Sequence, residues 1–177
     1  MFDFLVLIRD ICLLRRGPQD VPYSIPLLAA VVSASVLLEV AVAIARDIPV
    51  AGVVAEAVVW LVFALGGLNL ALTLRGLRSR FVQAATALLG CALMFTLLIL
   101  PIALFATEPP ATAPQPLTPM QLLVAVVALP LAIWKVVVDA HIFRHSLDIP
   151  FLSGVMIALL WIIAAAALAA ATGAPGV

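Results

Sequence analysis

The chain has 177 residues, of which 66% are hydrophobic and 10% are charged, and its formal net charge is zero. Soluble globular domains are about 45–50% apolar and about 25% charged, so this composition excludes a water-soluble fold. The mean hydropathy is +1.31, and no polar stretch is long enough to fold separately. We therefore predict a single transmembrane domain over residues 1–177.

Residues 1–16 are predicted to form an interfacial helix. A helix over the first fourteen residues reaches about 21 Å, which is too short to span a bilayer. Arg15 and Arg16 follow the apolar run, whereas a signal peptide carries its positive charge before it, so we expect no cleaved signal peptide. The segment either lies on the cytoplasmic membrane surface or docks against the bundle.

Five long apolar stretches fill most of the remaining chain. Each has 19 to 26 residues, and a helix needs about 20 residues to cross the hydrocarbon core of a bilayer. The fold class is therefore all-α, a polytopic membrane bundle with five transmembrane helices. The predicted spans are residues 25–45, 53–74, 81–106, 120–138 and 151–171.

Proline and polar residues set the expected ends of these helices. Ser24 is a predicted N-cap of the first span, and Asp148 of the last. The proline-rich segment 107–119 is expected to be an extended outer loop. Pro130 should kink the fourth span, which we expect to continue as helix past the membrane surface.

Two sets of small side chains suggest how the helices pack. The last span is rich in alanine, so we expect it to pack inside the bundle rather than face lipid alone. Gly67 and Ala71 form a second small-residue pair. Cys12 and Cys91 are expected to be free buried thiols, too far apart in depth to pair.

The basic residues predict the orientation. If five spans alternate, eight of the nine lie on one side and only Arg46 lies on the other. This asymmetry predicts a cytoplasmic N-terminus, a C-terminus outside and a bacterial inner-membrane location. The eight are Arg9, Arg15, Arg16, Arg75, Arg78, Arg80, Lys135 and Arg144.

A few polar residues lie within the predicted spans. Ionisable groups at membrane depth need a partner or a functional role. Glu39 and Glu56 both lie toward the outer face, with Arg46 between them in the sequence. They form either a structural ion pair or hydrogen-bonded group, which we favour, or a proton or cation site. Asn69 is predicted to join two helices by hydrogen bonding.

The cytoplasmic end of the fourth span is the densest polar cluster. Lys135 and Asp139 are four residues apart and can pair on one helix face. His141 and His145 have the same spacing, which could place two imidazoles on one metal, but a zinc site needs three or four protein ligands. We therefore favour an edge that contacts headgroups or a partner, with Arg144, over a metal site.

The segment Gly17-Pro18-Gln19-Asp20-Val21-Pro22-Tyr23-Ser24, before the first span, carries an Asp-x-Pro-Tyr pattern. With five spans and the orientation above, the chain resembles the Yip1-like family of small membrane proteins. The resemblance implies a five-helix bundle and supplies no catalytic residues. Eukaryotic members have a longer acidic lead and are linked to vesicle traffic; the residues before the first span do not resemble that lead, so we do not expect that role here.

These observations favour a non-enzymatic interaction or scaffold protein without a cofactor. Its predicted partners are membrane lipid and another membrane protein or a second copy of itself, and no nucleic acid is expected. The alternative is a small transporter or transporter subunit that uses Glu39 and Glu56. A third hypothesis, an enzyme acting on lipid headgroups with Asp139, His141 and His145, has the least support because phosphate-loop, HExxH, GxSxG and CxxC motifs are absent.

Overall fold

The computed structural model describes residues 2–105 and 119–172, and within them every regular element is helical. This confirms the predicted all-α class. Five of the helices are long and apolar enough to cross a membrane. In chain order the elements are α1 (Phe2–Cys12), η1 (Pro18–Asp20), α2 (Ile25–Ala45), α3 (Val50–Leu74), η2 (Arg78–Arg80), α4 (Phe81–Phe105), α5 (Pro119–Leu147) and α6 (Phe151–Thr172).

Most predicted boundaries agree with the structure. The hydroxyl of Ser24 accepts a hydrogen bond from the amide of Leu27, which confirms Ser24 as the N-cap of α2. The expected continuation of the fourth span is also confirmed, because α5 runs without interruption through Pro130 to Leu147. The kink at Pro130 stays a prediction, and nearly all of the predicted outer loop 107–119 lies outside the described residues.

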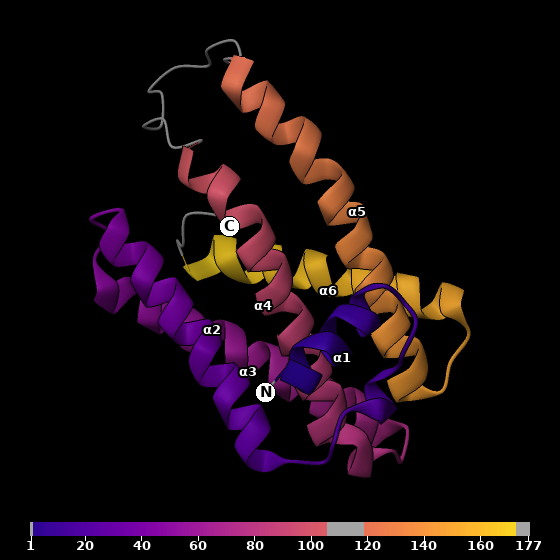
Figure 1. Ribbon diagram of the computed structural model, residues 1–177. Coiled ribbons are helices and arrows are strands. Elements are labelled where there is room, and N and C mark those ends of the chain that lie inside the picture. The colour runs from indigo at the N-terminus through magenta and orange to yellow at the C-terminus, as the bar shows by residue number, and fades with distance from the viewer. Residues whose placement is uncertain (1, 106–118, 173–177) are drawn as a thin grey trace.

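The helix α4 is the centre of the bundle. Half of its span is buried, against 11% to 22% for the other four spans, and α4 contacts α1, α2, α3 and α5. Its first half is rich in small residues, among them Ala84, Ala85, Ala87 and Gly90, and these let neighbouring helices approach closely. In Figure 1, α2 and α3 lie on one side of α4 and α5 on the other.

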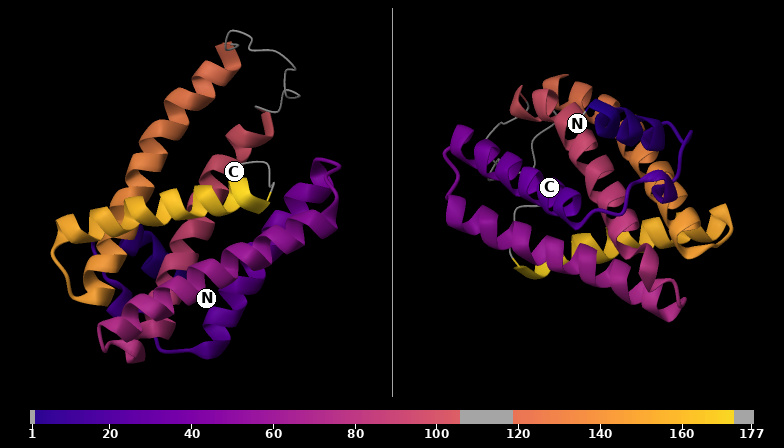
Figure 2. Two further views of the ribbon diagram at one scale, coloured as in Figure 1. Left: turned by 180° about the vertical axis from the view of Figure 1, so that it is seen from behind. Right: turned by 60° about the horizontal axis from the view of Figure 1, so that its bottom comes forward.

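The described helices converge at one end of the molecule and diverge toward the other (Figures 1 and 2). We call the first the compact end; it holds α1, η1, η2 and the turn from α5 to α6. The guanidinium of Arg75 donates to the carbonyl oxygens of Leu147 and Asp148, and that of Arg80 to the carbonyl of His145. These bonds join the two basic turns, as alternating spans require. Arg46 lies at the opposite, divergent end, in the turn between α2 and α3.

The N-terminal helix α1 docks against α4, one of the two placements expected from the sequence. Its buried face contains Leu7, Ile8, Ile11 and Cys12. A Cβ atom built on Gly90 would lie 2.7 Å from the Cδ1 atom of Ile8, so this glycine allows the close approach of α1. The opposite face of α1 is exposed. A position at the membrane interface stays a prediction.

Docking of α1 confirms one part of the expectation for the two cysteines, Cys12 and Cys91, and overturns the other. Both thiols are free and buried, as expected, but they lie near enough to interact with each other. The sequence interpretation placed them at different depths because it assumed that Cys12 lay on the membrane surface. In the fold, α1 lies along the first half of α4, which brings its last residue beside Cys91.

The packing of α6 also differs from expectation. A Cβ atom on Gly154 would lie 2.5 Å from the carbonyl oxygen of Ala140, so α6 meets the backbone of α5 there. Gly67 of α3 also allows a close approach, but to a side chain, because a Cβ atom there would lie 2.9 Å from the ring of Trp161. The alanine-rich second half of α6 is largely exposed, and only 11% of the span is buried. The expected interior position is wrong because α6 packs through its N-terminal half.

Candidate functional site

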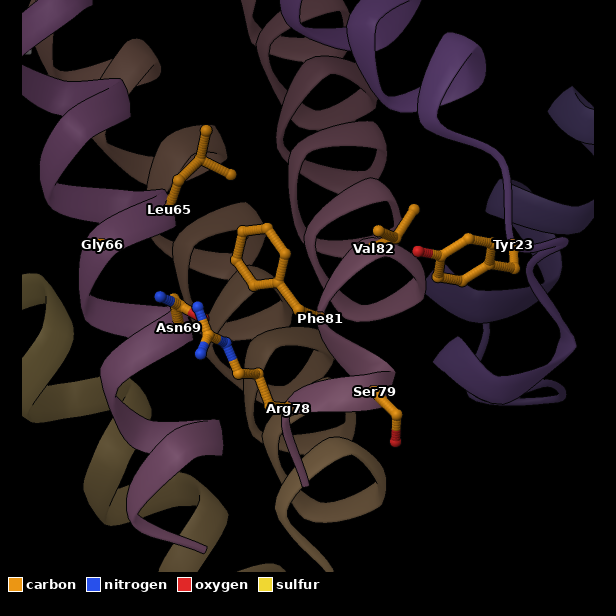
Figure 3. A pocket seen from close by; sticks show the side chains of 8 residues that line it. All are labelled: Tyr23, Leu65, Gly66, Asn69, Arg78, Ser79, Phe81 and Val82. Atoms are coloured by element: carbon orange, nitrogen blue, oxygen red, sulfur yellow. The ribbon is translucent and has the colours of Figure 1, made fainter. Parts of the chain in front are cut away.

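One pocket of the described residues lies between the segment just before α2, the second half of α3 and the turn into α4 (Figure 3). We call it the α2–α3–α4 pocket. Its volume is about 550 Å³, within the range of about 300–1,000 Å³ that is common for small-molecule sites. It is lined by Tyr23, Leu65, Gly66, Asn69, Arg78, Ser79, Phe81 and Val82.

A helix-ending motif places the basic side of this pocket. Gly76 has a φ of +69°, in the left-handed region where glycine is favoured over other residues. The amide of Leu77 donates to the carbonyl of Leu72 and that of Gly76 to the carbonyl of Thr73. This is the Schellman arrangement, which ends α3 and reverses the chain. The one-turn helix η2 follows and sets Arg78 beside α3.

Polar and apolar side chains are sorted within the pocket. Figure 3 shows the guanidinium of Arg78 beside the amide of Asn69, while the ring of Phe81 is directed toward Leu65. Asn69 and Leu65 lie one helical turn apart on α3. The pocket therefore changes over about 6 Å from a polar mouth at the turn to an apolar wall inside the span.

The predicted role of Asn69 in joining two helices stays a prediction. Its side chain makes no hydrogen bond to another helix within the described part of the chain, and it lines the pocket. Its backbone carbonyl accepts a hydrogen bond from the Thr73 hydroxyl of the same helix. Sequence reasoning identified Asn69 and Arg78 separately but missed the pocket, because Tyr23 joins them from a distant part of the chain.

Arg78 differs from most other arginines of the compact end. Arg9 donates to the carboxylate of Asp10 at 2.8 Å, which lowers the pKa of Asp10, and Arg75 and Arg80 bind backbone carbonyls. Within residues 2–105 and 119–172, neither a carboxylate nor a carbonyl is bound to the exposed guanidinium of Arg78. The guanidinium of Arg78 therefore lines the pocket with N–H donors that bind no described acceptor.

The predicted cytoplasmic edge on α5 is mostly internal. Lys135 donates to the carboxylate of Asp139, which confirms the predicted pair. Asp139 and His141 are buried, and Nε2 of His141 lies 2.9 Å from the carbonyl oxygen of Arg16. Of the five predicted edge residues only Arg144 is exposed. The edge available to headgroups or a partner is therefore narrower than expected.

The histidine spacing places the two rings side by side. The ring centroids of His141 and His145 lie 4.5 Å apart in an edge-to-face arrangement. Within the described residues, no group of three histidine, cysteine or acidic side chains is placed to hold a metal ion. Nε2 of His141 is engaged by the backbone carbonyl of Arg16, so this nitrogen is not available to a metal in this arrangement.

A second, smaller pocket of about 280 Å³ lies between η1, the start of α4 and the end of α5. Its lining includes Arg80, Gln83, His145 and Ser146. The amide of Gln83 donates to the carbonyls of Gln19 and Val21, and Arg80 donates to that of His145. The buried hydroxyl of Ser146 has no hydrogen-bond partner among the described residues. Most hydrogen-bond donors that line this pocket are therefore already bound to backbone carbonyls of the protein.

The predicted intramembrane acids lie close to each other. Glu39 on α2 and Glu56 on α3 interact electrostatically across the α2–α3 hairpin, toward the divergent end. The side chain of Glu39 is exposed in the bundle and that of Glu56 is half-buried. Arg46 lies in the turn that joins these two helices. Both hypotheses for these acids, a structural pair or hydrogen-bonded group and a proton or cation site, stay predictions.

Comparison with known proteins yields no relative from which a role can be carried over. No family model matches the chain, and no curated protein or solved structure matches it. The resemblance to the Yip1-like family therefore stays a prediction based on the segment from Gly17 to Ser24 and on the number of spans.

Proposed function

We propose that this protein is a multi-pass membrane protein of the Yip1-like type, without enzymatic activity, that acts by binding other membrane components. The role of the polar side chains at the compact end carries this proposal. Five of them, from the C-cap of α3 and from η2, α4 and α5, bind backbone carbonyls at the end of α1, in the segment between α1 and α2, or at the end of α5. They are Arg75, Arg80, Gln83, Trp134 and His141.

Such bonds support a structural platform rather than a reaction centre. A catalytic side chain must reach substrate, whereas these donors are occupied by the protein's own backbone. They fix α1 and two turns on the ends of the spans, and a rigid surface is what a binding protein presents. The basic residues collected at this end favour a cytoplasmic position for it and, in a bacterium, the inner membrane.

The uncovered helix faces supply surfaces for membrane partners. Ala166 and its neighbours on α6 are small and exposed, and small residues allow close helix contact in lipid. We expect Ala166→Leu to reduce co-isolation of a partner, or of a differently tagged second copy, from native membranes. Ala34→Leu, on the exposed face of α2, is the matched control. Equal recovery with both variants would count against an α6 interface.

A transporter remains the second candidate, favoured by the proximity of Glu39 and Glu56. Two carboxyl groups within electrostatic range raise each other's affinity for a proton, which is one property of a proton site. Purified protein in vesicles containing a pH-sensitive dye would test this. The scaffold proposal predicts the same slow pH change with wild type, Glu39→Gln and empty vesicles. Fast flux that Glu39→Gln abolishes would establish transport instead.

A further inference from the structure

We infer that the α2–α3–α4 pocket binds one anionic phospholipid, with the headgroup phosphate on Arg78 and an acyl chain against Leu65 and Phe81. This inference requires that α2, α3 and α4 span a membrane. It does not require the scaffold role, so either can fail alone.

The charge of the pocket suits a phosphate. Arg78 contributes an exposed guanidinium that pairs with no carboxylate in the described part of the chain. A guanidinium offers a planar set of donors that matches two phosphate oxygens. The amide of Asn69 lies beside this guanidinium, and Tyr23 and Ser79 line the same pocket, although the Ser79 hydroxyl is directed away from Arg78 in Figure 3. These neutral groups add donors without a competing negative charge.

The order of polar and apolar groups favours a lipid over a soluble phosphate. Arg78 and Ser79 belong to the turn at the end of the spans, whereas Leu65 and Gly66 lie more than two helical turns before the end of α3 at Leu74, about 12–14 Å deeper. A phospholipid has the same order, with its phosphate at the interface and its chains in the hydrocarbon. A free phosphate would use only the mouth of the pocket and leave the apolar wall unoccupied.

The location also favours an anionic lipid. The pocket opens at the compact end, where the basic turns lie, and the positive-inside rule places that end at the cytoplasmic leaflet. Basic pockets between transmembrane helices on this side are known to suit anionic headgroups. A zwitterionic lipid offers the same phosphate but adds a cation that Arg78 would repel.

Titration of lipid into the purified full chain in detergent tests whether the charge of Arg78 selects an anionic lipid. Native mass spectrometry counts bound phosphatidylglycerol and phosphatidylcholine. We expect one phosphatidylglycerol to bind preferentially and Arg78→Gln to weaken it about tenfold, the loss expected for one charge-assisted contact. Arg144→Gln removes the same charge from an exposed position outside the pocket and should change binding less than about twofold.

A substitution that fills the α2–α3–α4 pocket tests, independently of charge, whether the lipid occupies this pocket. Gly66 lines the pocket, and a Cβ atom there would meet nothing within 4 Å. Gly66→Leu should therefore occupy the pocket without disturbing packing, and it should weaken phosphatidylglycerol binding. Gly52, on the same helix at the divergent end, is equally open. Gly52→Leu is the matched control and should bind as wild type does.

Three results would overturn the inference. Equal weakening by Arg78→Gln and Arg144→Gln would show diffuse charge attraction. Unchanged binding in Gly66→Leu would place the lipid elsewhere. Competition by glycerol 3-phosphate as effective as that by phosphatidylglycerol would show that the pocket takes a soluble phosphate. Arg78→Lys, which keeps the charge, provides a second variant if Arg78→Gln does not fold, and it should weaken binding less.

Discussion

The contact of Gly154 with α5 gives the sharpest prediction for stability. In Gly154→Ala the new methyl group would lie 2.5 Å from the carbonyl oxygen of Ala140, a backbone atom that cannot rotate away. An ordinary contact is at least about 3.4 Å, so α6 must move by nearly 1 Å or the helices must separate. Overpacking of this kind costs about 1–3 kcal/mol.

A matched glycine isolates that cost. Alanine also favours a helix over glycine by about 0.5–1 kcal/mol, and this gain applies equally to Gly52→Ala. Because a Cβ atom on Gly52 meets nothing within 4 Å, the difference between the two variants measures the clash alone. For a chain of this size, 1–3 kcal/mol corresponds to a difference in Tm of about 2–12 °C.

The protein contains its own reporters for this assay. Cys12 and Cys91 are buried, with 2% and 0% of their surfaces exposed, so a thiol-reactive fluorophore labels them only on unfolding. Heating both variants in detergent with this fluorophore gives the two Tm values. We expect Gly154→Ala to melt below Gly52→Ala. Equal values would refute the close contact between α5 and α6.

Three further predictions test the compact end. Gly90→Leu should displace Ile8 and with it α1, so Cys12 should react with a thiol reagent in the native protein at least about tenfold faster, as the kinetics of labelling would show. Mild oxidation of wild type should form a disulfide between Cys12 and Cys91. Cleavage at a protease site placed in the α2–α3 turn would then leave two fragments joined by this disulfide. Fragments that separate would contradict the docking of α1. Lys135→Met should lower the free energy of unfolding by about 3–5 kcal/mol, measured by thermal unfolding, because it leaves the buried Asp139 carboxylate unpaired. The double variant Lys135→Met with Asp139→Leu should recover most of that loss.

Local patterns were sufficient for the elements and for contacts within one helix. Apolar length predicted the five spans, Ser24 was recognised as a cap, and the four-residue spacing of Lys135 and Asp139 predicted their pairing. In each case the interacting groups are near in sequence, so helix geometry alone determines that they meet.

Contacts between distant segments could not be predicted in this way. The proximity of Cys12 to Cys91 depends on where α1 docks, and Gly90, which permits that approach, has no signature of its own. Asp148 was expected to cap α6, but with a φ of +57° it ends α5, a position usually held by glycine. The pocket combines residues from three helices, and its clearest sequence signal was a basic turn without nearby acids.

The placement of the turns across a membrane is the central claim, and labelling of single cysteines tests it most directly. In a variant with Cys12→Ser and Cys91→Ala, one cysteine is introduced at Asp47, Ser79 or Asp148, all of which are exposed. A membrane-impermeant maleimide is applied to sealed vesicles of known orientation. We predict that the cysteines at positions 79 and 148 are labelled from the cytoplasmic side and that at position 47 from the other. Labelling of all three from one side, or of positions 79 and 148 from opposite sides, would contradict the account.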